Sequence, residues 1–179
     1  MLLIRKATSN DAEAILSIYK PFIENTAITF EFTVPDIEEF RLRINPIIEH
    51  YPYLVCEFNN QVIGYAYAHK FRERAAYDWD IETSVYVDEK FHQQGVATKL
   101  YEKLIDECTL QGFHNAFAGI TLPNIKSERF HTKLGFTEIG VFKNAGFKQG
   151  VWHSVLFMER NLIPCEGTPE PVKSKHTGN

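Results

Sequence analysis

The hydrophobic residues of this chain recur with two different spacings, and each spacing predicts one kind of secondary structure. Alternation of apolar and polar positions is typical of strands, whereas apolar residues three or four positions apart are typical of amphipathic helices. The first pattern predicts strands at residues 2–7, 53–58, 62–69, 81–87, 116–121, 136–142 and 151–158. The second pattern predicts helices over about residues 12–23, 36–46, 98–111 and 124–134.

Local signals mark the ends of several of these helices. Thr8 and Asp11 have the spacing of a capping box before the first helix. Asp36 opens the second helix, and we expect Pro46 to kink or end it, because proline has no amide hydrogen and clashes with the preceding turn. Gly135 stands where a left-handed C-cap would follow the last helix.

The order of these elements predicts the fold class. The order β-α-α-β-β-β-α-β-α-β-β is typical of an α/β fold of the mixed α+β kind, with a twisted, mostly antiparallel sheet and helices on both faces. Residues 1–162 show no internal repeat, which predicts a single domain. Residues 163–179 contain Pro, Gly, Lys, Ser and Thr and little to bury, so we expect a disordered tail.

Composition narrows the class of partner. The chain has 179 residues, is 44% hydrophobic and 23% charged, and carries a formal net charge of -4. It therefore has no basic field to attract nucleic acid or an anionic membrane. No apolar run approaches the roughly 20 residues that a membrane span needs, and Arg5 interrupts the apolar start too early for a secretory signal. We expect a cytoplasmic protein without nucleic-acid or membrane partners.

The cysteines and histidines do not form a metal-binding pattern. Cys56, Cys108 and Cys165 lie far apart, and the seven histidines show no paired spacing of the kind that binds zinc. Cys56 falls in an apolar strand and Cys108 in a helix, where small buried thiols are expected. The sequence therefore predicts no metal site.

The most informative segment is the polar turn between the strand at 81–87 and the helix at 98–111. A strand, a glycine-bearing turn and a helix present free backbone N–H groups at a helix N-terminus, where the helix dipole favours an anion. Gly95 lets a bulky group approach the main chain, and Ala97 leaves room beside it. The turn suits a pyrophosphate, although it lacks the GxxxxGK[ST] and GxGxxG patterns. The alternative is an ordinary strand-to-helix connection.

Two separated motifs resemble those of the GNAT superfamily of N-acetyltransferases. Residues 85–100 resemble the acetyl-CoA signature of that family, and residues 124–136 resemble its second motif. Further segments resemble the phosphinothricin acetyltransferase subfamily: Tyr77-Asp78-Trp79, Glu82, Leu122-Pro123-Asn124, Ala145-Gly146-Phe147-Lys148 and Trp152-His153. The resemblance covers about residues 2–162. It departs from the family at His92, where Gln or Arg is usual, which leaves the turn usable through its backbone donors.

The resemblance implies acetyl-CoA as co-substrate, no metal, and a set of residues that contact the cofactor. These residues are Val85, Tyr86, Val87, His92, Gln93, Gln94, Gly95, Val96, Ala97, Thr98, Asn124 and Ser127. Backbone N–H groups near residues 85–87 would stabilise the oxyanion of the reaction. Asn124 would either cap the following helix or bond the pantetheine arm, and these two roles are compatible.

Two catalytic residues are implied by the same motifs. Glu82 is the candidate base that removes the proton of the amine, directly or through one water; the alternative is a strand glutamate that faces solvent or pairs with an arginine. His131 stands where many members of the family carry a tyrosine near the coenzyme sulfur, and it could bond the departing thiolate or orient the substrate. Its alternative is a helix-face histidine bonded to a neighbour.

The segment before the central strand and the first helix-helix connection are expected to bind the amine. Arg74 could clamp a carboxylate because its planar guanidinium binds two oxygens at once, whereas Arg72 is expected to be a solvated charge. Tyr77 and Phe30 would form the walls of the pocket.

The resemblance implies acetylation of the α-amino group of a small amino-acid analogue such as phosphinothricin, methionine sulfoximine or methionine sulfone, hence a role in resistance or detoxification. Members of the subfamily are commonly homodimers, and residues 147–152 could supply the contact. The alternatives are a GNAT enzyme for another amine, a regulatory domain that binds acetyl-CoA without turnover, and an unrelated α/β scaffold with another phosphate ligand.

Overall fold

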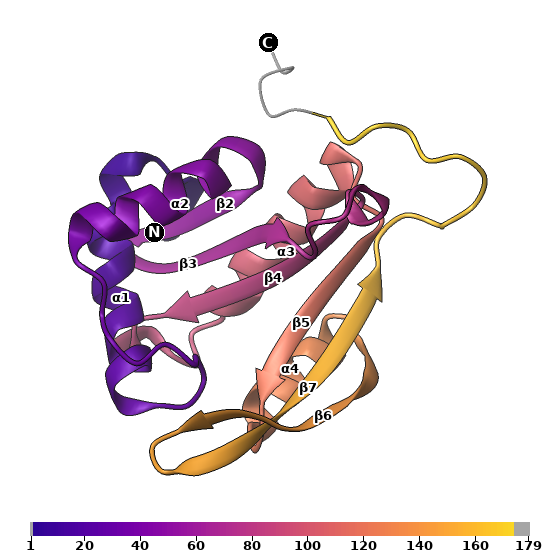
Figure 1. Ribbon diagram of the computed structural model, residues 1–179. Helices are drawn as coiled ribbons and strands as arrows, with labels where there is room; N and C mark the ends of the chain where they lie inside the picture. The colour runs from indigo at the N-terminus through magenta and orange to yellow at the C-terminus, as the bar shows by residue number, and fades with distance from the viewer. Residues whose placement is uncertain (1, 174–179) are drawn as a thin grey trace.

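The computed structural model describes residues 2–173 (Figure 1). Its strands are β1 (Leu2–Lys6), β2 (Tyr53–Phe58), β3 (Gln61–Lys70), β4 (Asp80–Val87), β5 (Asn115–Thr121), β6 (Thr137–Lys148) and β7 (Val151–Asn161). Its helices are α1 (Ala12–Asn25), α2 (Ile37–His50), α3 (Val96–Gln111) and α4 (Ile125–Lys133), with short 3-10 turns η1 (Ser9–Asp11), η2 (Ala75–Tyr77) and η3 (Glu89–Phe91). The order of strands and α-helices confirms the order predicted from the sequence.

The strands form one sheet in the order β1-β2-β3-β4-β5-β7-β6. Neighbouring strands are antiparallel, except that β4 and β5 are parallel. A parallel pair needs a crossover connection, and α3 supplies it between these two strands. The sheet is therefore mixed and mostly antiparallel, as the sequence predicted.

The two faces of the sheet carry separate cores, because successive side chains along a strand point to opposite faces. α1 and α2 cover the face that presents Tyr53 and Tyr65. α3 packs on the other face, which presents Ala66 and Ile81, and Leu134 at the end of α4 joins that second core. The prediction of helices on both faces is thus confirmed.

Several predicted boundaries were tested by the structure. Gly135 follows Leu134, the C-cap residue of α4, and has φ +84, which confirms the left-handed glycine predicted after the last helix. Pro46 lies inside α2, which continues to His50, so the proline does not end that helix. The carbonyl that loses its partner belongs to Leu42, whose side chain is 76% exposed, so water can reach that side of the helix.

The last hairpin is longer than the sequence indicated. β6 continues from residue 142 to Lys148, and β7 continues from residue 158 to Asn161. The register shifts between Glu138 and Gly140 and again between Phe142 and Gly146, so three short stretches of β6 pair with β7. The longer irregularity lies at residues 143–145. The polar residues at this irregularity break the alternation that predicts strands.

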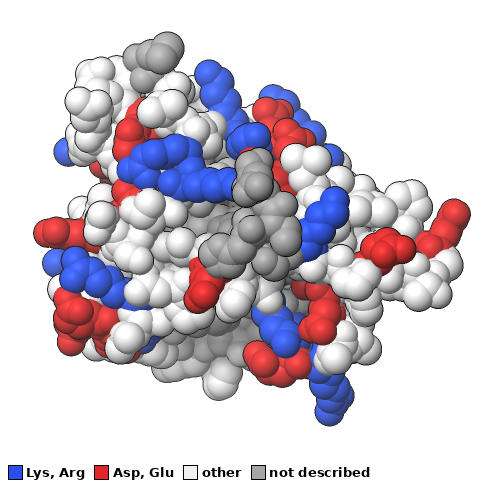
Figure 2. Space-filling view, turned by 90° about the horizontal axis from the view of Figure 1, so that it is seen from above, with Lys and Arg blue, Asp and Glu red and all other residues white. Residues whose placement is uncertain are grey.

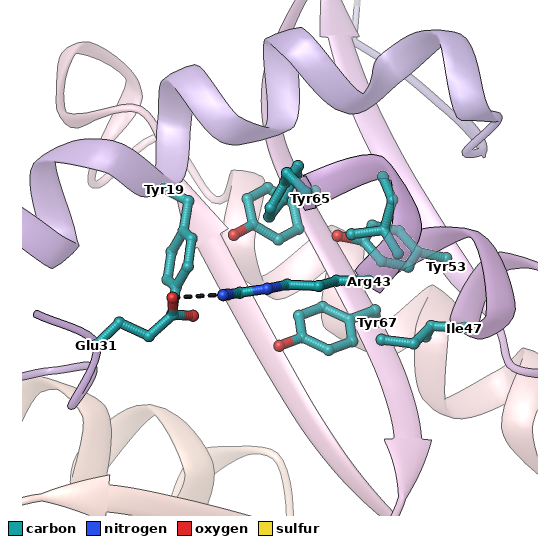
Figure 3. A pocket seen from close by; sticks show the side chains of 9 residues that line it. Tyr19, Glu31, Arg43, Ile47, Tyr53, Tyr65 and Tyr67 are labelled. Atoms are coloured by element: carbon teal, nitrogen blue, oxygen red, sulfur yellow. Dashed lines mark hydrogen bonds and ion pairs between the residues drawn. The ribbon is translucent and has the colours of Figure 1, made fainter. Parts of the chain in front are cut away.

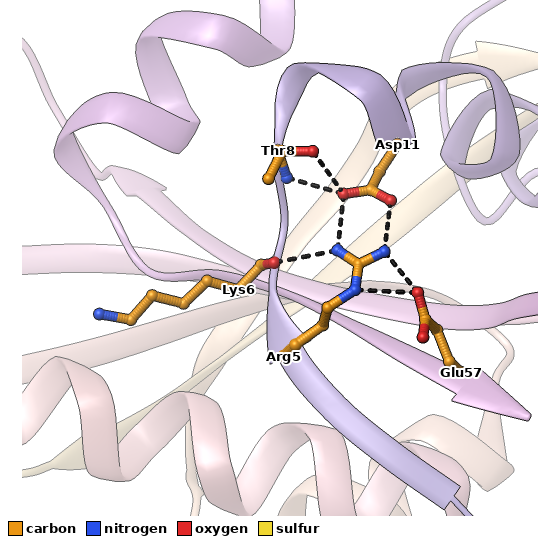
Figure 4. A network of polar contacts seen from close by, with 5 residues as sticks. All are labelled: Arg5, Lys6, Thr8, Asp11 and Glu57. Carbon is orange, nitrogen blue, oxygen red and sulfur yellow. Dashed lines mark hydrogen bonds and ion pairs between the residues drawn. The ribbon is translucent and has the colours of Figure 1, made fainter. Parts of the chain in front are cut away.

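A network around Arg5 joins the edge strand β1 to the start of the first helix (Figure 4). Arg5 Nη1 and Nη2 donate to both oxygens of Asp11 at 2.8 and 2.7 Å, and Arg5 Nε donates to Glu57 at 2.8 Å. Asp11 also accepts from the Thr8 amide at 2.7 Å, which satisfies the cap that the sequence predicted. The Arg5 guanidinium holds the pKa of Asp11 below its usual range.

The predicted disordered tail begins at residue 163, and its residues 174–179 lie outside the described residues. Residues 163–173 run along the domain: the Trp79 indole donates to the Glu170 carbonyl at 2.7 Å, and the Lys173 amide donates to Gln111 at the end of α3 at 2.8 Å. Val172 packs against the core on the α3 face. Composition could not indicate such single contacts.

The remaining features are the surface charge, the cysteines and the character of the helices. Figure 2 shows acidic and basic side chains mixed over the face seen from above. Cys56 and Cys108 are both buried, as predicted. Within residues 2–173, none of the helices combines the length and the apolar character that crossing a membrane takes. The same residues contain no cluster of His, Cys, Asp and Glu that could hold a metal ion.

Candidate active site

The parallel strands β4 and β5 are paired only where they begin. The register joins Asp80–Glu82 to Asn115–Phe117, although β4 continues to Val87 and β5 to Thr121. Beyond Glu82 the two strands diverge, as Figure 1 shows. We call the point where they separate the strand branch. There, the facing edges leave the ladder, so their backbone N–H and C=O groups can serve an extended ligand.

The turn before α3 ends in left-handed backbone. Gln93 has φ 62 and Gly95 has φ 77, and α3 begins at Val96, which anchors it in the core. Half-buried Ala97 and Thr98 complete the first turn. The first amides of an α-helix have no acceptor within it. A Cβ on Gly95 would meet nothing within 4 Å, so the main chain is open to a bulky anion at the positive end of the helix dipole.

Two side chains of this turn brace it from within. His92 Nε2 lies 2.9 Å from the Val87 carbonyl, and because a carbonyl only accepts, Nε2 carries the hydrogen of that bond. Gln94 donates its side-chain amide to the carbonyl of Lys90 at 3.2 Å. The turn therefore offers a ligand mainly backbone donors, and the departure from the family at His92 leaves those donors in place.

The residues at the end of β4 have their side chains committed to the two cores. The ring of Tyr86 packs against Tyr19 and Phe22 of α1, each at a centroid distance of 5.0 Å. Val85 and Val87 belong to the core on the α3 face. What these residues can offer at the strand branch is therefore their backbone.

Glu82 is the last residue of β4 that pairs with β5. Its half-buried side chain lies on the α1–α2 face, with His69 as its register partner on β3 and Phe117 as its partner on β5. Its Oε1 is 3.5 Å from the position that a Cβ would take on Gly119. The ion pairs found among residues 2–173 do not include Glu82. The carboxylate thus lies at the strand branch without a cation that would hold it.

An aromatic wall adjoins Glu82, and of its three residues the sequence predicted only Tyr77. Phe71 stacks on Phe117 with centroids 4.2 Å apart and an interplanar angle of 18°. Tyr77 meets Phe71 edge-on at 6.0 Å. The guanidinium of Arg72 lies 5.0 Å from the centre of the Phe71 ring and 5.6 Å from that of Tyr77, which is the geometry of a cation–π contact.

The two arginines of this segment are both exposed but lie differently. Arg72, expected to be a solvated charge, is exposed and also has its guanidinium over the aromatic wall. Arg74, expected to clamp a carboxylate, is exposed at the start of η2. Alternation of residue types could not show which arginine lies over the rings, because that depends on the path of the loop.

A pocket of about 180 Å³ opens on the same face of the sheet as Glu82 (Figure 3). Its lining is Tyr19, Glu31, Phe40, Arg43, Ile44, Ile47, Tyr53, Tyr65 and Tyr67. Burial raises the pKa of the Tyr53, Tyr65 and Tyr67 hydroxyls, which are therefore neutral phenols. Arg43 Nη1 donates to Glu31 at 2.8 Å and supplies the charged end of the pocket. No local pattern of residues predicted this pocket, since its lining comes from α1, the α1–α2 connection, α2, β2 and β3.

His131 lies on the other face of the sheet. It is 6% exposed, and its ring meets those of Tyr101 and Phe136 edge-on at 5.4 and 5.3 Å. It is connected to the strand branch through Tyr101, whose hydroxyl is 2.6 Å from Thr83 Oγ1, and Thr83 donates to the Phe117 carbonyl at 3.0 Å. The structure thus does not place the side chains of His131 and Glu82 on the same face.

The protonation of His131 follows from its surroundings. Burial lowers its pKa below the ordinary value of 6.5, and a bond of Nδ1 to the Ser127 carbonyl at 2.8 Å opposes that shift. Because the carbonyl accepts, Nδ1 carries the hydrogen, so Nε2 of the neutral ring can accept a proton but cannot donate one.

Asn124 and Ser127 organise the start of α4. Asn124 Oδ1 accepts from the Ser127 amide at 3.2 Å, which is the N-cap bond predicted for it. Ser127 Oγ lies 3.3 Å from His131 Nδ1. Phe30, the other predicted wall residue, packs instead against the last hairpin, with its ring over Gly146.

Comparison with known proteins shows the family to which the chain belongs. Residues 4–156 match the family model described as acetyltransferase (GNAT) domain. A phosphinothricin N-acetyltransferase of Streptomyces viridochromogenes is 36% identical over 171 residues, which are 95% of this chain and 92% of that protein. An L-methionine sulfoximine/L-methionine sulfone acetyltransferase of Salmonella typhimurium is 34% identical over 165 residues, 89% of this chain and 94% of that protein.

A solved structure gives the same result at the level of the fold. A GNAT phosphinothricin acetyltransferase of Sinorhizobium meliloti in complex with acetyl-CoA has a TM-score of 0.87 at 34% identity, covering 98% of this chain and 94% of that one. Fold and similarity together define an N-acetyltransferase. The chain belongs to the GNAT acetyltransferase family.

The environment of His131 generates a prediction about stability and pH. Since its folded-state pKa lies below 6.5, the unfolded chain takes up this proton first as the pH falls. The resulting loss of unfolding free energy is absent at pH values above the pKa of His131 in the unfolded chain, and it grows as the pH falls below that pKa. Between about pH 7.5 and about pH 5.5, the unmodified protein should therefore lose more unfolding free energy than His131→Asn. Urea titrations at both pH values measure this, with exposed His50→Asn as the control. If all three proteins lose the same unfolding free energy, the lowered pKa of His131 is contradicted.

Proposed function

We propose that this protein transfers the acetyl group of acetyl-CoA to the α-amino group of a small amino-acid analogue. One observation carries the proposal: the strand branch at Glu82 lies near the start of β4, and the turn that follows the end of β4 leads to the open helix N-terminus at Gly95. A ligand whose diphosphate binds at the first and whose extended arm follows the unpaired edge of β4 would have its far end near the carboxylate. Acetyl-CoA has this composition.

The backbone and side chains at the branch have distinct tasks in this proposal. Glu82 takes a proton from the ammonium group of the substrate, which frees the lone pair for attack on the thioester carbonyl. An amide of β4 near Val85–Val87 donates to the oxyanion that forms, and one such donor typically supplies about 3 kcal/mol. The carbon–sulfur bond then breaks, the thiolate takes up a proton, and an amide remains.

The substrate class is inferred from the relatives and from the walls of the site. The two curated relatives described above are named for phosphinothricin and for methionine sulfoximine and sulfone, all small amino-acid analogues. Arg72 and Arg74 lie on the loop before β4, where either can approach a carboxylate, and Tyr77 adds an aromatic surface. We propose that the role of the enzyme is detoxification of such analogues. The free thiol of Cys56 and an acetyl-CoA donor fit the reducing cytoplasm.

The base is tested by replacing Glu82. Glu82→Gln keeps the size of the side chain but cannot accept the proton, so turnover should fall by about 10²–10⁴-fold at neutral pH. A thiol-release assay with phosphinothricin, methionine sulfoximine, methionine sulfone and a polyamine measures it, together with calorimetric acetyl-CoA affinity, which should not change.

The control for this substitution is Glu138→Gln, which removes an exposed strand glutamate on β6. Near-normal turnover of Glu82→Gln would remove Glu82 as the base. If the unmodified protein binds acetyl-CoA but acetylates none of the amines, the catalytic proposal fails.

The helix N-terminus is tested at Gly95. An added methyl group at φ +77 strains the backbone and occupies the space that the diphosphate would need, so Gly95→Ala should raise the Kd for acetyl-CoA by about tenfold or more. Gly167→Ala is the matched control, because Gly167 has φ +66 and equally open surroundings but lies in the tail. Equal affinities in the two variants would exclude the turn as the diphosphate site.

We further propose that the protein forms a homodimer through the last hairpin. Large apolar side chains are exposed along it, including Phe142, Phe147, Val151 and Trp152 at 57, 49, 52 and 63%. The rings of Phe147 and Trp152 lie 5.4 Å apart and form a continuous apolar surface. Surfaces of this kind on a soluble protein commonly mark an interface.

Sedimentation velocity tests the interface. The unmodified chain should sediment as a dimer, and Trp152→Glu should shift it toward monomer because a charge would be buried in an apolar contact. Leu110→Glu, at a 69% exposed position on α3, is the control and should remain dimeric. A monomer at all concentrations, or a dimer unaffected by Trp152→Glu, would contradict this part of the proposal.

A further inference from the structure

Lys148 at the end of β6 is a buried amine that the proposed chemistry does not use. It is 4% exposed, and its Nζ donates to the carbonyls of Ile23 and Thr29, both at 2.8 Å. Burial lowers the pKa of Lys148, and Glu31 opposes that shift. The Ile23 carbonyl belongs to the last turn of α1, where the helix dipole favours a cation. One ammonium group thus joins the end of a helix to the segment that follows it.

A second contact lies two residues before Lys148. The ring of Phe30 covers Gly146 so closely that an added Cβ would come within 2.3–2.6 Å of three of its ring atoms. Phe30 also lies 6.2 Å from His153, which is the register partner of Gly146 on β7. Only glycine leaves room for the ring at this position. Both contacts hold the same segment, the connection between α1 and α2 at residues 26–36.

The other side of that connection is fixed to the pocket of tyrosines. The Tyr19 hydroxyl lies 2.6 Å from Thr29 Oγ1 and donates to Glu31 at 3.0 Å. Glu31 in turn accepts from Arg43, so it lines the pocket shown in Figure 3. Between these anchors, the Ile28 carbonyl lies 3.5 Å from Thr121 Oγ1, at the end of β5. The connection therefore reaches from the pocket to the last hairpin past the end of β5.

We propose that Lys148 and Gly146 are positioning residues that hold the α1–α2 connection in place beside the part of the site that binds the amine. We call these two contacts the clamp. Through the clamp, the last hairpin determines the affinity for the amine. This rests on the proposed function, because it assigns the pocket of tyrosines, on the same face of the sheet as Glu82, to the acceptor. Lys148 acts through the connection: its ammonium group bonds two main-chain carbonyls and is buried, so it does not touch the reacting atoms. Loss of the clamp loosens Glu31 and Phe30 together.

The clamp itself is measured by hydrogen exchange on the full-length protein. Lys148→Met keeps the length of the side chain but leaves two buried carbonyls without their donor, so the amides of residues 26–36 should exchange about tenfold faster or more. The amides of α3 should not change, which distinguishes local release from general destabilisation. Lys143→Met, an exposed lysine on the same strand, is the control. Unchanged exchange over residues 26–36 in Lys148→Met would overturn the clamp.

Kinetics test the consequence for the substrate. In Lys148→Met the KM for the accepted amine should rise by about tenfold, with a smaller change in kcat and an unchanged Kd for acetyl-CoA. Gly146→Ala retains the charge of Lys148 but displaces Phe30, so it should also raise the KM for the amine with a smaller change in kcat. This second variant remains informative if Lys148→Met does not fold. Faster exchange with an unaltered KM for the amine in both variants would overturn the link to the substrate.

The clamp and the proposed function fail in different ways. If the unmodified protein acetylates no amine, the proposed function and the link to amine affinity are overturned. The exchange measurement still decides whether Lys148 holds the connection, because it requires no turnover.

Discussion

The separation of β4 from β5 is the constraint on which the rest of the site depends. β4 pairs with β3 along almost its whole length, and β5 pairs along its whole length with β7. Only three residue pairs join the two strands to each other. The sheet therefore consists of two halves, β1–β4 and β5–β7–β6, each with its own twist. Where the halves part, main-chain groups become available in the interior of a sheet, which is rare because ladders normally satisfy them.

The chemistry at this branch depends more on backbone than on side chains. Gly95 and the first turn of α3 provide an anion site whose donors are amides, and the side chains of Val85, Tyr86 and Val87 serve the two cores. The side chain of His92 likewise serves the protein and not the ligand, because its ring bonds the Val87 carbonyl at the end of β4. Glu82 differs from all of these: it is a carboxylate on the face away from α3, without an ion pair among the described residues.

The walls around the carboxylate come from both halves of the sheet. Phe71 on the β3–β4 loop stacks on Phe117 of β5, which links the two halves next to Glu82. On the other side, Lys148 of β6 bonds the end of α1 and the segment after it. Aromatic stacking and two hydrogen bonds from a buried ammonium group thus connect halves that share few ladder bonds. Such contacts can hold the two halves at a fixed separation while leaving the branch open.

The sequence by itself determined the elements, the mixed sheet, the glycine turn and the family, because periodicity, caps and motifs are properties of neighbouring residues. Asn124 as a helix cap and Gly135 as a left-handed residue belong to the same class of local facts. Only the tertiary structure decided that His131 and Glu82 lie on opposite faces, that Arg72 rather than Arg74 rests on the rings, and that Lys148 reaches residues more than a hundred positions away. The physical reason is that these relations depend on loop paths and on packing between distant segments, which no local pattern of residue types records.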